Sequence, residues 1–204
     1  LLKNVETVES LKLFPLSYHS QRLVVLEQVS ACYGNPPIPV SEPVTMEIRN
    51  GDRICLRGKN GCGKSSLFRL ILGEQTEAAG KIWRGLGLKI SYVSQDTSHL
   101  RGSLREYARA FQVEEHLICA LLRKLDFSRE QLEKPLEALS QGQKKKVLIA
   151  RSLCEQAHLY LWDEPLNYVD VYSRIQIQEL ILKFQPTMVF VAVSYTHLRA
   201  HETC

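Results

Sequence analysis

The feature that most constrains the fold is a glycine-rich segment, Gly58 to Ser65, which fits the pattern G-x-x-x-x-G-K-[ST]. Glycines let the backbone fold into a nest whose N–H groups point at phosphate oxygens. A short apolar stretch, Ile54-Cys55-Leu56, precedes this segment, and helical periodicity from Ser66 to Leu72 follows it. A strand, a glycine loop and the positive end of a helix, in that order, predict a phosphate site in an α/β domain.

Two side chains at the end of this loop suit a nucleoside triphosphate that carries a divalent cation. Lys64 supplies a mobile charge for the β- and γ-phosphates, and Ser65 supplies a hydroxyl for Mg²⁺. The alternative is a glycine turn followed by a solvated lysine. The strand before the loop and the helix after it favour the phosphate site.

The remaining apolar segments predict a mainly parallel sheet covered on both faces, because continuous apolar strands alternate with helices. We expect the segment from about 75 to 138 to be helix-rich and more polar. The strands and the further helix that we expect are Leu23–Leu26, Val44–Ile48, His158–Trp162, Met188–Val193 and a helix from Val171 to Phe184 that Pro186 ends.

Two carboxylates follow the apolar strand that ends at Trp162. Ligands bind at the carboxyl ends of parallel strands, so Asp163 and Glu164 are placed to act on the nucleotide. Asp163 would hold Mg²⁺, directly or through water, and Glu164 would act as the general base on a water molecule. The alternative is a pair of solvated acids, which the glycine loop in the same chain disfavours.

A second helix start lies at Leu139-Ser140-Gln141-Gly142-Gln143. Ser140 followed three residues later by Gln143 is a capping box, which predicts a helix N-terminus. One interpretation stops at this cap. The other is that this helix end binds phosphate, and since Gly58–Ser65 already holds the chain's own phosphates, it would serve the nucleotide of another subunit.

Composition adds few constraints. The 204 residues carry a net charge of +4, which is too small to argue for nucleic acid by itself. The six cysteines match no zinc or disulfide framework, and reduced thiols in the cytoplasm are the simple interpretation. No apolar stretch approaches the roughly 18 residues that a membrane span needs. The chain begins with Leu1, so we expect it to be part of a longer protein.

Together these motifs resemble the ABC ATP-binding cassettes, over roughly residues 23 to 193. Gly58–Ser65 resembles Walker A, Leu159–Glu164 resembles Walker B, and Leu139–Gln143 resembles the ABC signature. Gln95 resembles the Q-loop glutamine, and Leu166–Asp170 resembles the D-loop. Tyr33 resembles the aromatic residue that stacks on adenine, although core packing is the alternative for Tyr33 and for Gln95.

The resemblance implies an ATPase with ATP and Mg²⁺ as cofactors. Its catalytic residues would be Glu164, Gln95 and Lys64, and its metal ligands Ser65, Gln95 and Asp163. The residues that would contact ATP, including the signature residues that face a partner's ATP, are Tyr33, Gly58, Lys59, Asn60, Gly61, Cys62, Gly63, Lys64, Ser65, Ser66, Ser140, Gly142 and Gln143. The fold would be an α/β P-loop NTPase with a mainly parallel core, an N-terminal antiparallel β portion and a helical signature subdomain.

Within that family the sequence is most similar to the second cassette of ABC-F proteins, in the branch that protects ribosomes from antibiotics. Trp162–Asn167 and Ser140–Lys146 carry this resemblance. It implies a cytoplasmic protein with a second cassette, contacts to ribosomal RNA and tRNA, and no membrane insertion. The alternatives are the ATP-binding subunit of a membrane transporter and a non-catalytic nucleotide-sensing module, which the intact Glu164 disfavours.

The same resemblance divides the chain. Residues 1–22 would be the end of the linker between cassettes, and residues 23–193 the ATPase domain, with the helical subdomain at about 97–150. The family's switch histidine is expected just after Phe190-Val191, but Ala192-Val193-Ser194 stands there. Residues 194–204 resemble nothing in the family, so we expect a foreign tail in which neither His197 nor His201 takes the switch role.

Overall fold

The computed structural model describes residues 15–39, 41–59, 61–74 and 78–191. The chain forms two compact units. The sheet unit comprises Pro15–Gln95, Ala157–Pro165 and the chain from Gln185 onward, and the helical unit comprises Asp96–Gln156 and Leu166–Phe184. The predicted linker end before residue 15 and the predicted tail from residue 194 lie outside the described residues.

A parallel sheet forms the centre of the sheet unit. Its strand order is β4 (Arg53–Leu56), β8 (Met188–Val191), β7 (Leu159–Trp162) and β6 (Ile90–Val93). All three neighbouring pairs are parallel. Every residue of β7 and β8 is buried, as the continuous apolar sequence of these two strands requires in a covered parallel sheet.

An antiparallel sheet forms the second layer of the same unit. The long strand β1 (Arg22–Tyr33) pairs with β3 (Val44–Arg49) and with β5 (Ala78–Arg84), and the short β2 (Ile38–Pro39) pairs with the end of β1. The β1 pairings shift register around Gln28, which has a positive φ of 51°. A bulge of this kind bends a long strand and increases its twist.

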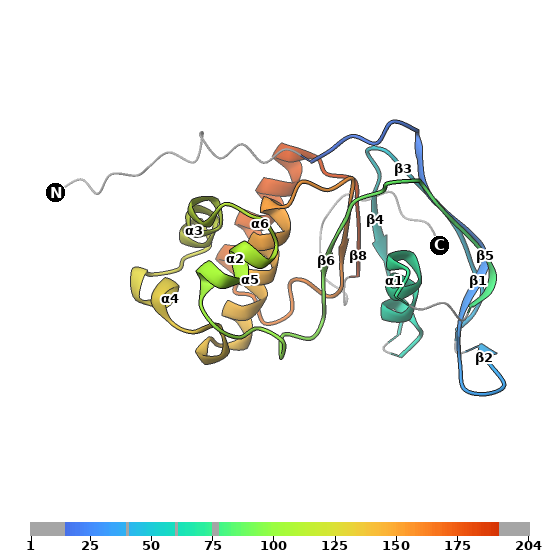
Figure 1. Cartoon of the computed structure of the whole chain (residues 1–204), viewed down its shortest axis with the longest axis horizontal. Helices are drawn as coiled ribbons and strands as arrows, with labels where there is room; N and C mark the ends of the chain where they lie inside the picture. The colour runs from blue at the N-terminus through green and yellow to red at the C-terminus, as the bar shows by residue number, and fades with distance from the viewer. Residues whose placement is uncertain (1–14, 40, 60, 75–77, 192–204) are drawn as a thin grey trace. The chain divides into compact units, whose positions relative to one another are not determined.

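Helix α1 (Lys64–Leu72) joins the two layers, and Figure 1 shows it between the strands of the parallel and the antiparallel sheet. Gly73 ends the helix in the left-handed conformation, as the sequence predicted. The core of the unit gathers Phe68 and Ile71 from α1 with Leu161 and Val189 from the parallel sheet and Leu26 from β1. Burial of these side chains therefore fixes the direction in which α1 leaves β4.

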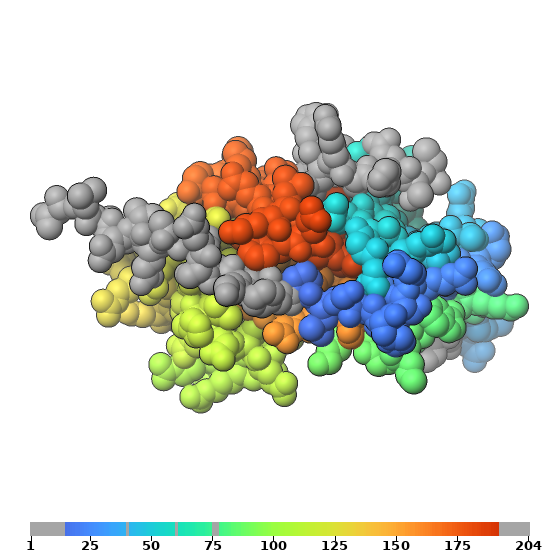
Figure 2. Space-filling model, turned by 90° about the horizontal axis from the view of Figure 1, so that it is seen from above, coloured from blue at the N-terminus to red at the C-terminus, as the bar shows by residue number. Residues whose placement is uncertain are grey.

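The side chain of Asn50 helps to anchor the start of the sheet unit. Asn50, between β3 and β4, donates through Nδ2 to the carbonyl groups of Tyr18 and Ser20 at 2.7 Å each, and accepts from the Tyr18 N–H at 3.2 Å. The blue and cyan segments that carry these residues lie side by side on the face shown in Figure 2. The turn at residues 50–52 is thus fixed to the entry of β1.

The helical unit is built from short capped helices around an aliphatic core. Ile118, Leu121 and Leu122 of the second helix and Val147 and Leu148 of the helix that begins at Gln141 are fully buried. Among the described residues, no helix is both long and apolar enough to cross a membrane. In chain order the elements are α2 (Leu104–Ala110), α3 (Glu115–Lys124), α4 (Arg129–Glu133), the 3-10 turn η2 (Leu136–Ala138), α5 (Gln141–Cys154) and α6 (Val171–Phe184). Figure 1 labels the α-helices among them.

Several predicted elements are confirmed, and one expectation is wrong. Helix α6 has the predicted bounds, and β3, β4, β7 and β8 lie where strands were expected. The segment 75–138, however, is helical only from Leu104 onward, because it first forms β5 and β6. The sequence pattern did not predict these two strands. Strand β5 contains Ala-Ala-Gly, which has low strand propensity, and β6 has only four residues. Pairing with β1 and β7 outweighs the local preference.

The predicted bounds of the helical subdomain, about 97–150, stay a prediction. The helical unit of the structure is formed by two described segments, of which Asp96–Gln156 is the first. Its compact body takes in Leu166–Phe184 as well. Helix α6 contacts this unit directly, because the hydroxyl of Ser173 donates to the Leu125 carbonyl at the end of α3 at 3.2 Å.

Candidate nucleotide-binding site

The glycine loop connects β4 to α1. Its last glycine, Gly63, is the N-cap of α1 and has a φ of 94°, a backbone conformation that residues other than glycine rarely adopt. A Cβ at Gly63 would also lie 2.8 Å from the Cβ of Ser41. The position therefore requires glycine both for its backbone angle and for its surroundings. Asn60, a predicted contact of the nucleotide, lies outside the described residues.

Lys64, the first residue of α1, bends back over the loop. Its Nζ donates to the carbonyl oxygens of Gly58 and Lys59 at 2.8 Å each, and lies 3.7 Å from the Sγ of Cys62. The cation thus sits over the loop whose backbone N–H groups would receive phosphate. The contact of Lys64 with the β- and γ-phosphates stays a prediction.

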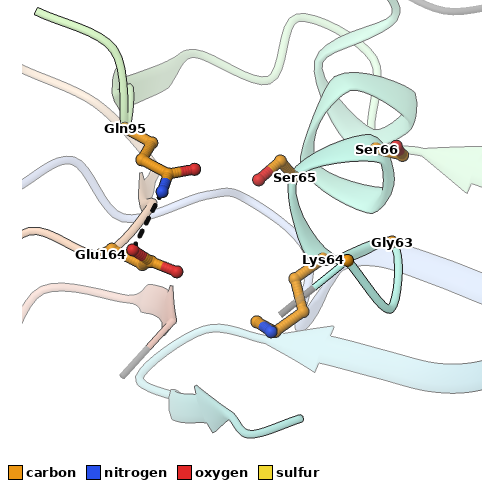
Figure 3. A pocket seen from close by; sticks show the side chains of 7 residues that line it. Gly63, Lys64, Ser65, Ser66, Gln95 and Glu164 are labelled. Carbon is orange, nitrogen blue, oxygen red and sulfur yellow. Dashed lines mark hydrogen bonds between the residues drawn. The ribbon is translucent and has the colours of Figure 1, made fainter. Parts of the chain in front are cut away.

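A cavity of about 300 Å³ opens beside this loop. Its volume lies at the lower end of the range typical of small-molecule sites. Figure 3 shows Lys64 and Ser65 on one side of this space and Gln95 and Glu164 on the other. The full lining is Gly61, Gly63, Lys64, Ser65, Ser66, Gln95 and Glu164, all of which the sequence assigned to the site.

Glu164 and Gln95 meet because their strands are neighbours. The side-chain amide of Gln95 donates to the Glu164 carboxylate at 3.0 Å. Gln95 follows β6 and Glu164 follows β7, and the parallel register pairs Val93 with Trp162 at the ends of these strands. Glu164 has a φ of 48°, a strained conformation for a residue other than glycine. Strain of this kind costs about 1–3 kcal/mol and is concentrated at functional sites.

Asp163, immediately before Glu164, carries a buried carboxylate with one unsatisfied oxygen. Its exposed fraction is 1%, and within the described residues Oδ2 has no hydrogen-bond partner. An unpaired buried carboxylate is costly unless a cation compensates it. Burial raises the pKa of the neighbouring Tyr92 to about 12, and the negative charge of Asp163 adds to that increase.

These residues fit a Mg²⁺ ion that arrives with a nucleotide. The described residues contain no group of three or more His, Cys, Asp or Glu side chains that could hold a metal alone. Mg²⁺ usually takes one or two carboxylates and completes its shell with water and substrate phosphates. The orphaned oxygen of Asp163 and the hydroxyl of Ser65, which lines the cavity, suit that arrangement.

Tyr33 lies at the end of β1, close to the first turn of α1. Its hydroxyl hydrogen-bonds to the hydroxyl of Ser66 at 2.9 Å. The side chain is 41% exposed, which excludes the core-packing interpretation. The ring is therefore accessible to a base that lies beside the loop.

The predicted capping box is confirmed in the helical unit. The Ser140 hydroxyl accepts from the Gln143 N–H at 3.2 Å, and the Gln143 side chain accepts from the Ser140 N–H at 2.9 Å. Helix α5 begins at Gln141 as a result. Ser140, Gly142 and Gln143 are not among the residues that line the cavity of the sheet unit.

The first two turns of α5 pack against the loop before α6. A Cβ at Gly142 would lie 2.3 Å from the carbonyl oxygen of Tyr168, so only glycine fits there. One turn further, Lys146 Nζ forms a 2.6 Å salt bridge with Asp170 and donates to the Leu125 carbonyl at 2.8 Å. The segment Leu166–Asp170 thus contacts α5 at two successive turns.

Sequence reasoning missed the role of Lys146. The run of three lysines reads as a solvated helix face, yet the Lys146 side chain is 9% exposed. The available signal is its position: Lys146 follows Gly142 by four residues and precedes Ala150 by four, on a face that the helix buries.

Comparison with known proteins identifies the family. A family model described as ABC transporter matches residues 41–167, which is more than half of the chain. The chain therefore belongs to the ABC transporter family as an ATP-binding cassette, a class of domain that hydrolyses ATP and typically pairs with a second cassette.

The curated relatives are ABC-F proteins, as the sequence resemblance predicted. ATP-binding protein Uup of Buchnera aphidicola is 31% identical over 74% of this chain and 27% of its own length. The probable ATP-binding protein YheS of Escherichia coli K12 is 30% identical over 83% of this chain and 27% of its own. Ribosome protection protein VmlR of Bacillus subtilis is 27% identical over 84% and 31%, respectively. The chain spans less than a third of the length of each of these relatives.

Solved structures confirm the predicted fold class. A putative ABC transporter ATP-binding protein from Pyrococcus furiosus superimposes with a TM-score of 0.71 at 23% identity. The match covers 86% of this chain and 93% of that one. At this identity the likeness supports the fold alone.

Proposed function

We propose that this cassette binds Mg-ATP at Gly58–Ser65 and hydrolyses it with Glu164 as the general base. The observation that carries the proposal is the cavity itself, which places the Glu164–Gln95 pair opposite Lys64 across a space beside the loop. A base, an orienting amide and a phosphate-binding cation around one space are the parts that γ-phosphate hydrolysis requires.

Each residue has its own role in the proposed reaction. Glu164 accepts the proton of the attacking water, and Gln95, bound to its carboxylate, orients both. Lys64 exchanges its carbonyl partners for phosphate oxygens and offsets the charge that develops there. Ser65 and Asp163 would hold Mg²⁺, which supplies further charge compensation when bound. Tyr33 stacks on the adenine ring.

A second cassette completes the site in this proposal. The helix end at Ser140–Gln143 offers backbone N–H groups, a hydroxyl and an amide to an anion. It belongs to a different unit from the cavity and would contact the γ-phosphate of an ATP held by the other cassette. This chain spans less than a third of the length of its relatives, so proteins of their length have room for a second cassette.

We further propose that the whole protein acts on the ribosome as an ABC-F ATPase, with ribosomal RNA and tRNA as its partners, and confers antibiotic resistance by ribosome protection. The similarity to Ribosome protection protein VmlR and to the Uup and YheS proteins supports this role. The alternative is service to a membrane permease. The two roles differ in what the ATP-bound state binds, so they can be separated directly.

The test is sedimentation of the full-length protein that contains this chain with purified ribosomes. The Glu164→Gln variant with ATP should remain on ribosomes, because the amide preserves ATP contacts but cannot accept the proton. The Lys64→Ala variant, which binds ATP poorly, should stay in the supernatant. Failure of the Glu164→Gln variant to sediment, together with copurification of a permease, would favour the transporter role.

A further inference from the structure

One partly buried hydrogen bond joins the start of α5 to the segment that follows Gln95. The hydroxyl of Thr97 donates to the side-chain carbonyl of Gln141 at 2.7 Å. Thr97 is 4% exposed and lies two residues after Gln95, whereas Gln141 is the first residue of α5. The two residues are 44 positions apart in the sequence, so the bond joins two separate segments of the helical unit.

The Thr97 side of this bond is rigid. Asp96 accepts from the Ser98 N–H at 2.9 Å and from the Ser98 hydroxyl at 2.6 Å, and the Leu100 N–H donates to the Thr97 carbonyl at 3.1 Å. Thr97 therefore sits inside a closed turn, and a buried β-branched side chain has few rotamers to lose. A contact from such a residue fixes its partner at small entropic cost.

The Gln141 side of the bond is the helix end that we propose faces the partner's ATP. The capping box uses the backbone N–H groups of Ser140 and Gln143. The two residues between them are Gln141 and Gly142, whose N–H groups belong to the first turn, where an α-helix has no carbonyl of its own to offer. The Thr97 contact holds one of these two residues, and the Tyr168 carbonyl packs against the other.

We infer that Thr97 and Gln141 are positioning residues, which set the orientation of the first turn of α5 for the ATP bound by the second cassette. The inference rests on the proposed function. The first turn is held from two directions: by the segment that follows Gln95 and by the segment that follows Glu164. Both segments continue directly from residues that line this cassette's own cavity.

The experiment uses the full-length protein that contains this chain, in two backgrounds. In the first, Glu164→Gln silences the ATP on this cassette, so the remaining turnover comes from the ATP that faces α5. In the second, the other cassette's general base is replaced instead. Thr97→Val and Gln141→Leu should each lower kcat about three- to tenfold in the first background, the range expected for one hydrogen bond. KM for ATP should stay within about twofold, and kcat in the second background should change little.

Two variants distinguish an effect on the orientation of α5 from a general loss of thermal stability. Thr97→Ser keeps the hydroxyl and should restore kcat to near the parent value. Thr187→Val is the matched control, because the buried hydroxyl of Thr187 accepts from the Gly51 N–H at 2.8 Å in the sheet unit. It should lower thermal stability about as much as Thr97→Val while leaving kcat unchanged in both backgrounds. The double variant Thr97→Val with Gln141→Leu should be no slower than either single variant, since both remove one bond.

Three results would overturn the inference: unchanged kcat in Thr97→Val, an equal fall in both backgrounds, or multiplicative effects in the double variant. A fall in the second background alone would assign Thr97 to the placement of Gln95 instead. Failure of the proposed function would give a different kinetic result. If replacing both general bases leaves turnover at the parent level, Glu164 is not the base, whatever Thr97 does.

Discussion

The Gln95 amide donates to the Glu164 carboxylate at 3.0 Å, and the two residues stand at the ends of adjacent parallel strands. Gln95→Ala removes the group that orients this carboxylate but leaves the glycine loop unchanged. We expect kcat of the full-length protein to fall by roughly tenfold or more, as for other residues that orient a reacting group, while the Kd for ATP changes less than about twofold. Steady-state kinetics and calorimetry check the two numbers, and a large loss of affinity with unchanged kcat would contradict the assignment.

Lys64 should govern ATP affinity. In Lys64→Ala the cation over Gly58 and Lys59 is lost, together with its charge-assisted contact to phosphate. Such a contact contributes about 1.5–3 kcal/mol, so the Kd should rise about ten- to a hundredfold. Calorimetric titration of the 204-residue chain with Mg-ATP measures it. The exposed Lys81→Ala of β5 is the control and should bind as the parent does, whereas parent-like binding by Lys64→Ala would remove Lys64 from the site.

Replacing Gly142 by alanine should change stability in the opposite direction to the usual effect of a glycine-to-alanine substitution in a helix. Alanine in place of glycine normally stabilises a helix interior by about 0.5–1 kcal/mol. Here the new Cβ would lie 2.3 Å from the Tyr168 carbonyl oxygen, so Gly142→Ala should destabilise the chain by about 1–3 kcal/mol. Urea unfolding should show this, and Lys144→Ala on the same helix should be nearly neutral. A stabilised Gly142→Ala would mean that the loop and the helix are not packed as described.

The Lys146–Asp170 pair predicts a specific pH dependence. Partial burial alone would raise the pKa of Asp170, but hydrogen bonds from Lys146 and Ser173 outweigh burial and hold that pKa well below its usual range. Asp170→Asn should lower the free energy of unfolding at pH 7 by about 1–2 kcal/mol, a modest value because the Asp170 side chain is half exposed.

The sign of the effect follows from the lowered pKa. The stabilisation is complete above the unfolded-state pKa of about 3.9 and is lost as the pH falls through the folded-state pKa. Urea unfolding should therefore give the same gap between parent and Asp170→Asn at pH 7 and pH 5, and a smaller gap near pH 3. The exposed pair Arg129–Glu133 is the control, and Glu133→Gln should cost less than about 0.5 kcal/mol. A gap that does not shrink in acid would contradict the pairing.

The sequence predicted those parts of the fold whose local pattern and tertiary environment agree. Fully apolar β7 and β8 could only be buried strands, and Gly73 and the Ser140–Gln143 box mark helix ends by their chemistry alone. It did not predict β5 and β6, which are strands because β1 and β7 pair with them.

The same division holds for the site. The glycine spacing of the loop and the position of Glu164 after an apolar strand predicted these residues, whereas Gln95 was assigned only by its resemblance to the Q-loop glutamine. Gln95, Glu164 and part of the loop line one cavity. The contacts of Lys146 with Asp170 and of Thr97 with Gln141 depend on packing between distant segments, which no local pattern records. Contacts of this kind become visible only when the segments are placed in space.

The most direct test of the central claim is phosphate release by the full-length protein in which the other cassette's general base has been replaced. In that background all turnover depends on the ATP at Gly58–Ser65. Glu164→Gln should lower the rate of phosphate release about a hundredfold or more. The Kd for ATP, measured by calorimetry, should stay within about twofold of the parent value. Phosphate release at the parent rate in the Glu164→Gln variant would show that another group activates the water, and the account of this site would be wrong.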